Sequence, residues 1–288
     1  MGLERRLLIR SQAGGVSLVR LRKNVVFDRL LARLLEVAPD RWVLKGALAL
    51  EYRLGAGTRT TMDVDLGRSD DEQESTEDFL KAQAAELGDF FVFIIERTAD
   101  LDEIQEGSAV RYHVESELAG RRFEAINVDV GFNDPIEAPE SLRGHDLLSF
   151  ADIAPIEVPA ISIAQHIAEK VHAYSRTYGA EGVLSTRVKD LVDLVLIAKG
   201  APVDAIELRA ALRQTFSIRG GRPLPPELPP PPVAWRVPYR RLAGQVGIPP
   251  QLEAAHAAAA GFLNPILSAD LESGEWEPNS RSWQEQRR

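Results

Sequence analysis

The stretch RTTMDVDL, residues 59–66, sets two aspartates one residue apart inside a segment that otherwise has the pattern of a short β-strand. Side chains alternate between the two faces of a strand, so Asp63 and Asp65 are predicted to project together on one face. Two carboxylates this close repel each other unless water solvates both or a cation lies between them. The pair is therefore either a surface feature or half of a metal site.

The segments around this strand predict an α/β fold with a mixed sheet. RWVLKG, residues 41–46, is predicted to be a brief strand, and ALALEYRL, residues 47–54, a helix. Residues 27–35 have the apolar spacing of an amphipathic helix. Ser75 and Asp78 resemble a capping box at the start of a helix running to Leu87. FFVFII, residues 90–95, has the composition of a buried strand.

A β-hairpin is predicted over residues 108–132, with its turn at Ala119 and Gly120. The returning strand is predicted to place one set of side chains on a common face, opposite Ile126, Val128 and Val130: Phe123, Ala125, Asn127 and Asp129. A third carboxylate, that of Asp129, is thus expected near the end of a strand.

Helical patterns dominate after about residue 150, with helices expected near 162–178, 186–198, 204–215 and 250–266. RPLPPELPPPP, residues 222–232, is expected to be an extended loop, because proline fixes its backbone and removes hydrogen-bond donors. Residues 274–288 are predicted to be a mobile tail, with Trp276 and Trp283 as candidates for docking. We therefore predict two domains, 1–150 and 151–288.

The composition narrows the classes of protein. The 288 residues are 44% hydrophobic, enough for one large or two moderate cores. The absence of cysteine excludes disulfides, thiolate zinc sites and a cysteine nucleophile. No stretch approaches the ~20 apolar residues of a membrane span, and no secretory signal is apparent, so we expect a cytoplasmic protein without a membrane partner.

Two clusters of basic residues flank an acidic middle, although the net charge is −9. An anionic polymer could lie across both clusters. Taken alone, these charges fit solvated helix faces and a loop better. The first cluster is Arg5, Arg6, Arg10, Arg20, Arg22, Lys23, Arg29 and Arg33; the second is Arg213, Arg219, Arg222, Arg236, Arg240 and Arg241, interleaved with Phe216, Trp235 and Tyr239.

The candidate site residues begin at Lys45 and Gly46, where a predicted strand passes into a predicted helix. At such a place backbone amides and the positive end of the helix dipole bind phosphate, and glycine permits close approach. Asp63, Asp65 and Asp129 supply the oxygen ligands that a hard divalent cation takes, with room left for phosphates. Magnesium is the natural candidate.

A lysine on a later predicted helix completes the pattern. Lys170 has His166 and Tyr174 one turn to each side, and Asp190 and Asp193 lie one turn apart on the next helix. A lysine facing a carboxylate–metal cluster would neutralise triphosphate charge. Each element alone has an ordinary explanation as surface charge, so the interpretation depends on their conjunction and order.

That order resembles a known family. LKGALAL, RTTMDVDL, INVDVGF, AEKVHAYSRT and RVKDLVDL follow one another as in the AbiEii-type nucleotidyltransferase toxins, which include the mycobacterial MenT group, within the DNA polymerase beta superfamily. The resemblance covers residues 27–239. It implies a polymerase-beta-like nucleotidyltransferase domain with a mixed sheet, followed by a mostly helical domain.

The resemblance also implies roles for individual residues. The matching positions are Gly46 for the glycine-rich motif, Asp63 and Asp65 for the D-x-D motif, Lys170 for the lysine, Asp190 for the later aspartate and Asp129 for the third carboxylate of the superfamily. The nucleotide is expected to contact Lys45, Gly46, Ala47, Arg59, Thr61 and Lys170.

Ala47 departs from the family, which usually has Gly or Ser there. Its methyl group allows backbone contact with phosphate but removes a side-chain hydrogen bond, which Thr58, Thr60 or Thr61 could supply instead.

The implied activity is magnesium-dependent transfer of a nucleotide from an NTP to an RNA hydroxyl. In related toxins the acceptor is a tRNA 3' end, and the family implies a cognate antitoxin. Two other classes stay open. A D-x-D motif after a strand also occurs in haloacid-dehalogenase phosphatases and metal-dependent glycosyltransferases, and the fold could serve as a non-catalytic NTP-binding scaffold.

Overall fold

The computed structural model describes residues 2–55, 57–100, 109–132, 138–178, 183–184, 187–219 and 223–284. It divides into two compact units, which we describe separately. The first contains Met1–Ala56 and Thr60–Ile161, and the second contains Gly57–Arg59 and Ser162–Arg288. No described helix is both long and apolar enough to cross a membrane.

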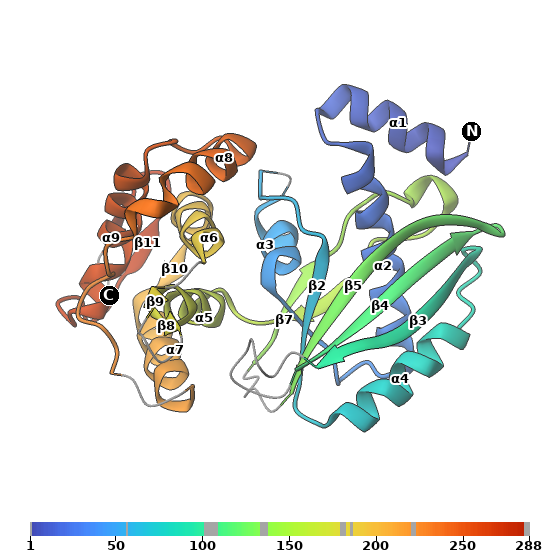
Figure 1. Cartoon of the computed structure of the whole chain (residues 1–288), viewed down its shortest axis with the longest axis horizontal. Coiled ribbons are helices and arrows are strands. Elements are labelled where there is room, and N and C mark those ends of the chain that lie inside the picture. The colour runs from blue at the N-terminus through green and yellow to red at the C-terminus, as the bar shows by residue number, and fades with distance from the viewer. Residues whose placement is uncertain are drawn as a thin grey trace. The chain divides into compact units, whose positions relative to one another are not determined.

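The first unit is built on a seven-stranded mixed sheet with strand order β3-β4-β5-β2-β1-β7-β6 (Figure 1). The β2–β5 and β1–β7 pairs are parallel and the other neighbours antiparallel, which confirms the predicted mixed sheet. The strands are β1 (Val43–Lys45), β2 (Asp63–Arg68), β3 (Phe91–Asp100), β4 (Ala109–Leu118), β5 (Arg121–Phe132), β6 (Glu140–Arg143) and β7 (Glu157–Ala160).

Helices α2 and α4 cover one face of this sheet (Figure 1). The amphipathic helix predicted at residues 27–35 is confirmed and is longer, because Ser17 caps its start by accepting a hydrogen bond from the Arg20 amide. Phe27, Leu30, Leu31 and Leu34 are fully buried and Leu35 packs partly buried against them, which places the main core between helix and strands. The helices of this unit are α1 (Leu3–Gly14), α2 (Leu18–Val37), α3 (Gly46–Leu54), α4 (Glu72–Ala84) and the 3₁₀ turn η1 (Ser149–Ala151).

Three predictions for this unit need correction. The α4 helix begins after Asp71, whose side chain accepts from the Glu74 amide, so the proposed capping box at Ser75 is wrong. The helix also ends at Ala84 rather than at Leu87. Residues 90–95 are not a fully buried strand: Val92 is 53% exposed, because α4 packs on β3 and only the face with Phe91 and Phe93 is buried.

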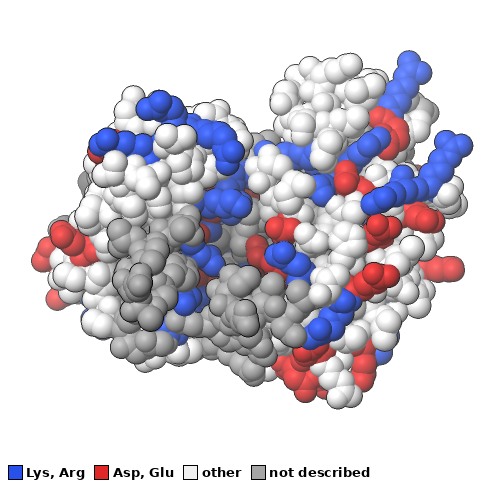
Figure 2. All heavy atoms as spheres, viewed as in Figure 1, with Lys and Arg blue, Asp and Glu red and all other residues white. Residues whose placement is uncertain are grey.

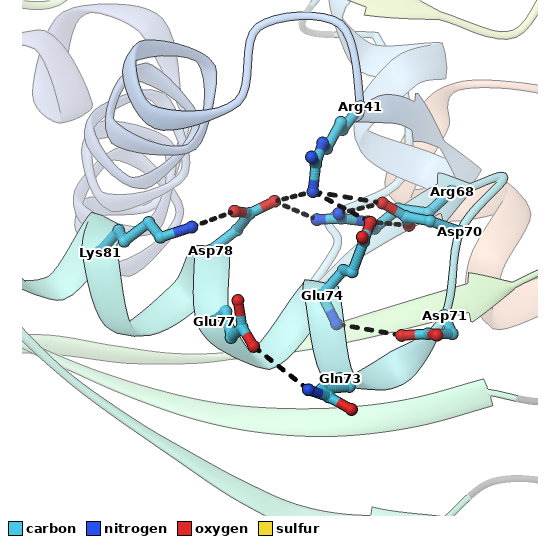
Figure 3. A network of polar contacts seen from close by, with 9 residues as sticks. All are labelled: Arg41, Arg68, Asp70, Asp71, Gln73, Glu74, Glu77, Asp78 and Lys81. Atoms are coloured by element: carbon cyan, nitrogen blue, oxygen red, sulfur yellow. Dashed lines mark hydrogen bonds and ion pairs between the residues drawn. The ribbon is translucent and has the colours of Figure 1, made fainter.

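Asp78, the other half of that proposed box, belongs to an ion-pair network at the far end of β2 (Figure 3). Arg68 is fully buried, donates to Asp78 at 2.9 Å and to Asp70 at 2.6 Å, and stacks over Trp42. Arg41 also contacts the carboxylates of this network. A buried guanidinium needs such partners, so the network fixes β2 against α4.

The predicted hairpin is present as β4 and β5, with one irregularity. The register shifts between Ser116 and Glu117, so that Phe123 is the extra residue of a β-bulge. Phe123 therefore turns into the core and does not share a face with Asp129, contrary to the prediction. Beyond the bulge the expected alternation holds.

The second unit is mostly helical, as expected. Its helices are α5 (Ile163–Ser175), α6 (Val188–Gly200), α7 (Ala205–Ile218), η2 (Val233–Trp235), α8 (Arg236–Val246) and α9 (Leu252–Leu267). Short strands accompany them: β8 (Thr177–Tyr178), β9 (Val183–Leu184), β10 (Val203–Asp204), β11 (Glu275–Glu277) and β12 (Ser282–Gln284). The sequence did not predict α8, nor β7 in the first unit.

The end of the chain is more ordered than predicted. Within the tail expected at 274–288, β11 and β12 pair as a hairpin that joins β10, and residues 285–288 lie outside the described residues. Trp276 is 3% exposed and donates to the Ala198 carbonyl at 2.7 Å, while Trp283 stacks on Phe262. Indole burial therefore anchors this hairpin to the helices.

The proline-rich segment is extended, as predicted, over its described part from residue 223. It is held by side chains of the neighbouring helices: Asn264 accepts from the Leu228 amide, and Tyr174 donates to the Pro229 carbonyl at 2.7 Å. These bonds fix the segment on the second unit.

Candidate functional site

Four charged residues form one row across four adjacent strands of the first unit. The register sets Arg111 of β4 opposite Asp129 of β5, Asp129 opposite Asp65 of β2, and Asp65 opposite Lys45 of β1. Residues that face each other in a ladder project on the same side of the sheet. The sequence of charges along the row is thus positive, negative, negative, positive.

A second row of polar residues lies on the same face, two residues away from the first along each strand, and it contains His113, Asn127 and Asp63. Asn127 donates to Asp63 Oδ1 at 3.0 Å, and the Asn127 Oδ1 atom lies 3.1 Å from Nδ1 of His113. The Thr61 hydroxyl donates to the Asp63 carbonyl at 2.8 Å and accepts from its amide. Asp63 and Asp65 therefore share one face, as the D-x-D spacing predicts, and Thr61 fixes the backbone between them and the preceding turn.

Gly46 is required by its contact with Asp65. It has a φ of +62°, and a Cβ atom there would lie 1.8 Å from Asp65 Oδ2. Only glycine combines this backbone with this proximity. Gly46 is also the first residue of α3, whose amino-terminal end carries partial positive charge, so the Asp65 carboxylate lies against the end of a helix that favours anions.

The neighbours of Gly46 are buried. Lys45 is 8% exposed and is the residue that precedes α3, and Ala47 in its first turn is 3% exposed. Burial therefore favours a small side chain at position 47, a requirement that Ala meets as well as the Gly or Ser usual in the family.

Arg111 is a site residue that the sequence did not predict. Its guanidinium donates to both oxygens of Asp129 at 2.7 Å. These hydrogen bonds raise the pKa of Arg111 above its ordinary value, and the charges of Asp129, Asp63 and Asp65 add to the effect despite some burial. Arg111 thus serves as counter-ion to the whole carboxylate group.

The β-bulge explains why Arg111 escaped prediction. Counting back from the turn at Ala119 and Gly120, a regular hairpin would set Arg111 opposite Val128. The extra residue shifts this pairing by one, and Arg111 meets Asp129 instead. The sequence does place an arginine within one residue of the position that would pair with Asp129. No residue pattern near Phe123 identifies the bulge.

The donor set of this face fits a magnesium ion held by two carboxylates. Magnesium in nucleotide-binding sites commonly takes one or two carboxylates together with water and substrate phosphates. Asp63 and Asp65 offer such a pair, and the glycine turn admits the Asp65 carboxylate where a Cβ would clash with it. A ready-made group of three metal-binding side chains is not found among the described residues, and the Asp129 carboxylate faces Arg111.

A second charged cluster lies within the second unit. Lys170 of α5 contacts Asp193 at 2.6 Å and Asp190 at 3.3 Å, both on α6, and Arg59 donates to both oxygens of Asp193. Asp193 is fully buried. Lys170 and Asp190 therefore come together as predicted, but the carboxylate between the two cations is that of Asp193.

The Lys170–Asp193 pair remains ionised in spite of its burial. Burial opposes the charged form of Lys170, but the charges of Asp193 and Asp190 outweigh it and raise the lysine pKa. Burial likewise works against ionised Asp193, but Lys170 and Arg59 lower its pKa. The predicted site residues thus lie in two groups: Asp63, Asp65 and Asp129 in the first unit, and Lys170 and Asp190 with Arg59 in the second.

Half of the first basic cluster is unavailable to a polymer, contrary to what the sequence suggested. Arg20, Lys23, Arg29 and Arg33 are buried in α2 and engage groups of the first unit. Burial would raise the pKa of Asp89, but hydrogen bonds from Arg33 and Arg29 lower it to about 2. These cations hold the fold together.

The second cluster keeps an exposed basic face, but its aromatic residues belong to the core. Phe216, Trp235 and Tyr239 are buried and cannot stack on bases. Figure 2 shows Lys and Arg side chains over the part of the second unit where α8 lies in Figure 1. Arg213, Arg240 and Arg241 are exposed, Arg219 and Arg236 pair with Glu169 and Glu253, and Arg222 lies outside the described residues.

Comparison with protein families gives a match over residues 29–263 to the model described as nucleotidyl transferase AbiEii toxin, type IV toxin–antitoxin system. The chain belongs to this family. The AbiEii assignment agrees with the mixed sheet, the glycine turn and the D-x-D strand described above.

Solved structures resemble this AbiEii-family chain over most of its length. MenT4, a nucleotidyltransferase toxin from Mycobacterium tuberculosis H37Rv, matches with a TM-score of 0.59 and 22% identity over 93% of this chain and 90% of MenT4. JHP933 from Helicobacter pylori matches with a TM-score of 0.46 and 14% identity, over 86% of this chain and 93% of the JHP933 chain. No curated protein matches the sequence. The likeness to MenT4 confirms the fold.

Proposed function

We propose that this AbiEii-family nucleotidyltransferase transfers a nucleoside monophosphate from an NTP to an RNA hydroxyl, with a tRNA 3' end as the acceptor, in a magnesium-dependent reaction. One observation carries the proposal: Asp63 and Asp65 share a sheet face with Asp129, and Asp65 lies directly against the Gly46 turn at the start of α3. Carboxylates beside a glycine turn and a helix amino-terminus suit a metal-bound triphosphate.

In this proposal Asp63 and Asp65 hold Mg²⁺, with Asp129 as a further ligand or as the base that receives the proton of the acceptor hydroxyl. Bound there, Mg²⁺ would neutralise charge on phosphate oxygens. Lys45, Gly46 and Ala47 would contact the triphosphate around the start of α3. Thr61 would act by fixing Asp63, since its hydroxyl is already bonded to that backbone.

Lys170 would bind phosphate, and Asp193 and Asp190 would keep it charged and oriented. Arg59 shares Asp193 with Lys170, so we propose that it contributes a second positive group to the same anionic ligand. Catalysis would then come from positioning and charge neutralisation.

The acceptor would reach the enzyme through phosphate contacts. Arg240 and Arg241 on α8 are exposed and suit an RNA backbone. Because NTPs and tRNA are cytoplasmic, we propose that the protein acts in the cytoplasm and is held in check there by a cognate antitoxin. The catalytic domain would correspond to the first unit and the helical domain to the second, so that the boundary predicted at residue 150 moves to Ile161, after β7.

The test incubates purified protein with total tRNA, MgCl₂ and each α-labelled NTP in turn, and measures label on RNA. Asp65→Ala and EDTA should both abolish labelling. Asp40→Ala, which changes an exposed aspartate of the same unit, should leave it intact. Labelling that survives in Asp65→Ala would refute the metal assignment, and labelled protein in place of RNA would refute the acceptor.

A further inference from the structure

Arg111 engages Asp129 in a way that competes with a metal ion. The two 2.7 Å hydrogen bonds form a bidentate pair, and the Asp129 side chain is only 11% exposed. A carboxylate whose two oxygens both face one guanidinium has its charge largely neutralised. For Asp129 to ligate a divalent cation strongly, Arg111 must first give up at least one of these bonds.

The exposure of Arg111 to solvent also allows it to move away from Asp129. Its side chain is 36% exposed, in contrast to Arg33 of the Asp89 pair, which is 1% exposed. A half-exposed guanidinium can exchange partners at small desolvation cost, whereas a buried one cannot. Lys45, at the other end of the row, is 8% exposed. Of the two cations that flank the carboxylates in this row, Arg111 is therefore the one suited to movement.

Binding of a metal ion would change the electrostatic forces between Arg111 and Asp129. A divalent cation on Asp63 and Asp65 would add positive charge next to Asp129, which faces Asp65 across the β2–β5 ladder. That cation would repel the guanidinium and attract the carboxylate. The phosphates that accompany it are anionic and bind guanidinium bidentately.

We propose that Arg111 occupies Asp129 until a metal–nucleotide complex arrives, and then passes from the carboxylate to the phosphates. Arg111 would thus neutralise the three neighbouring carboxylates before the metal–nucleotide arrives, and it would couple metal binding to phosphate binding. This inference rests on the proposed function, because it assumes that the carboxylates receive a metal–nucleotide.

The experiment measures Mn²⁺ binding by the loss of the free-ion EPR signal, without nucleotide, and then the binding of inorganic tripolyphosphate at saturating Mn²⁺ by calorimetry. The variants are Arg111→Gln, Arg111→Lys and Arg122→Gln. Arg122 is the matched control, since it pairs with Glu115 on the same β4–β5 ladder but is 70% exposed. Circular dichroism checks that each variant is folded.

Arg111→Gln is expected to bind Mn²⁺ about tenfold more tightly than wild type, the scale on which an adjacent opposite charge alters proton binding by a carboxylate. It should bind tripolyphosphate about tenfold more weakly, as for the loss of one hydrogen bond to a charged group. Arg111→Lys should fall between, because lysine is not bidentate. Arg122→Gln should match wild type.

Unchanged or weaker Mn²⁺ binding in a folded Arg111→Gln would overturn the inference and make Arg111 a purely structural partner of Asp129. Unchanged tripolyphosphate binding would overturn the transfer to phosphate. The proposed function is decided separately by RNA labelling in the wild-type protein. Wild-type labelling together with unchanged Mn²⁺ affinity in Arg111→Gln would thus reject this inference alone.

Discussion

Replacing Gly46 by alanine tests whether the turn before α3 exists to admit Asp65. The residue has a φ of +62°, and an added Cβ would lie 1.8 Å from Asp65 Oδ2, whereas real Cβ contacts essentially never fall below 3.0 Å. The Asp65 carboxylate must therefore retreat by more than about 1 Å, or α3 must move away from β2.

Two costs follow from this geometry. The left-handed backbone costs a non-glycine residue about 1–2 kcal/mol, which lowers the free energy of unfolding. The displaced carboxylate affects the site more strongly, because a misplacement of about 1 Å in a reacting group lowers the rate by roughly 100-fold. We therefore expect Gly46→Ala to remain folded, with a modest loss of stability and a large loss of nucleotidyl transfer.

Gly15→Ala is the matched control. Gly15 ends α1 with a φ of +68°, and a Cβ there would meet nothing within 4 Å. It imposes the same backbone strain without touching a carboxylate. Urea unfolding and RNA labelling should be measured on both variants. Similar losses of stability with transfer lost only in Gly46→Ala would support the account, and equal transfer rates in the two variants would refute it.

Three further predictions concern stability. His145 lies between the Asp28 and Glu51 carboxylates; burial opposes its charge, but hydrogen bonds to both acids raise its pKa to about 9 from 6.5. The protonated His145 therefore adds up to about 3 kcal/mol to the free energy of unfolding below pH 6.5. This contribution is lost as the pH rises through 9. Urea unfolding should show this loss in wild type, and an equal loss in His145→Gln would refute it. Asp193→Asn removes the buried charge that Lys170 and Arg59 share and should lower the free energy of unfolding by about 3–5 kcal/mol. Asp190→Asn should cost less, because Lys170 keeps its contact with Asp193. The reverse order of the two variants in chemical unfolding would contradict the arrangement of the cluster. Trp276→Ala removes a buried indole and should lower the free energy of unfolding by about 3–5 kcal/mol, and Trp283→Ala should lower it less. Thermal unfolding followed by circular dichroism measures both. No change in either variant would mean that the β11–β12 hairpin does not pack on the helices.

The strands and helices that carry the site could be predicted because their patterns are local. The D-x-D spacing alone puts Asp63 and Asp65 on one face, and a glycine between a short strand and a helix points to a turn against a ligand. The hairpin signal likewise placed Asp129 on a strand, near its end. These expectations need only alternation and turn chemistry, which neighbouring residues determine.

The remaining features depend on contacts between distant segments. Arg111 reaches Asp129 only because a bulge at Phe123 shifts the register, and nothing in the local sequence marks that bulge. The first basic cluster looked available until Arg29 and Arg33 were found around Asp89, a partner more than fifty residues away. Charge counts do not distinguish a buried ion pair from a binding surface, since both need the same residue types.

The preference of Lys170 for Asp193 over Asp190 has the same origin. Both aspartates lie on α6 one turn apart, and the spacing alone does not separate them. What separates them is Arg59, which reaches Asp193 from a segment that precedes β2 in the chain but belongs to the second unit.

The central claim is that the Asp63–Asp65 pair beside Gly46 holds a metal–nucleotide for attack at the α-phosphate. The most direct measurement is a pair of reactions with total tRNA, one with α-labelled and one with γ-labelled NTP, run with wild type and Asp63→Ala. The account predicts that wild type places α-label on RNA and releases γ-label as pyrophosphate, and that Asp63→Ala does neither. Release of γ-label as orthophosphate, its appearance on RNA, or full activity of Asp63→Ala would contradict the account.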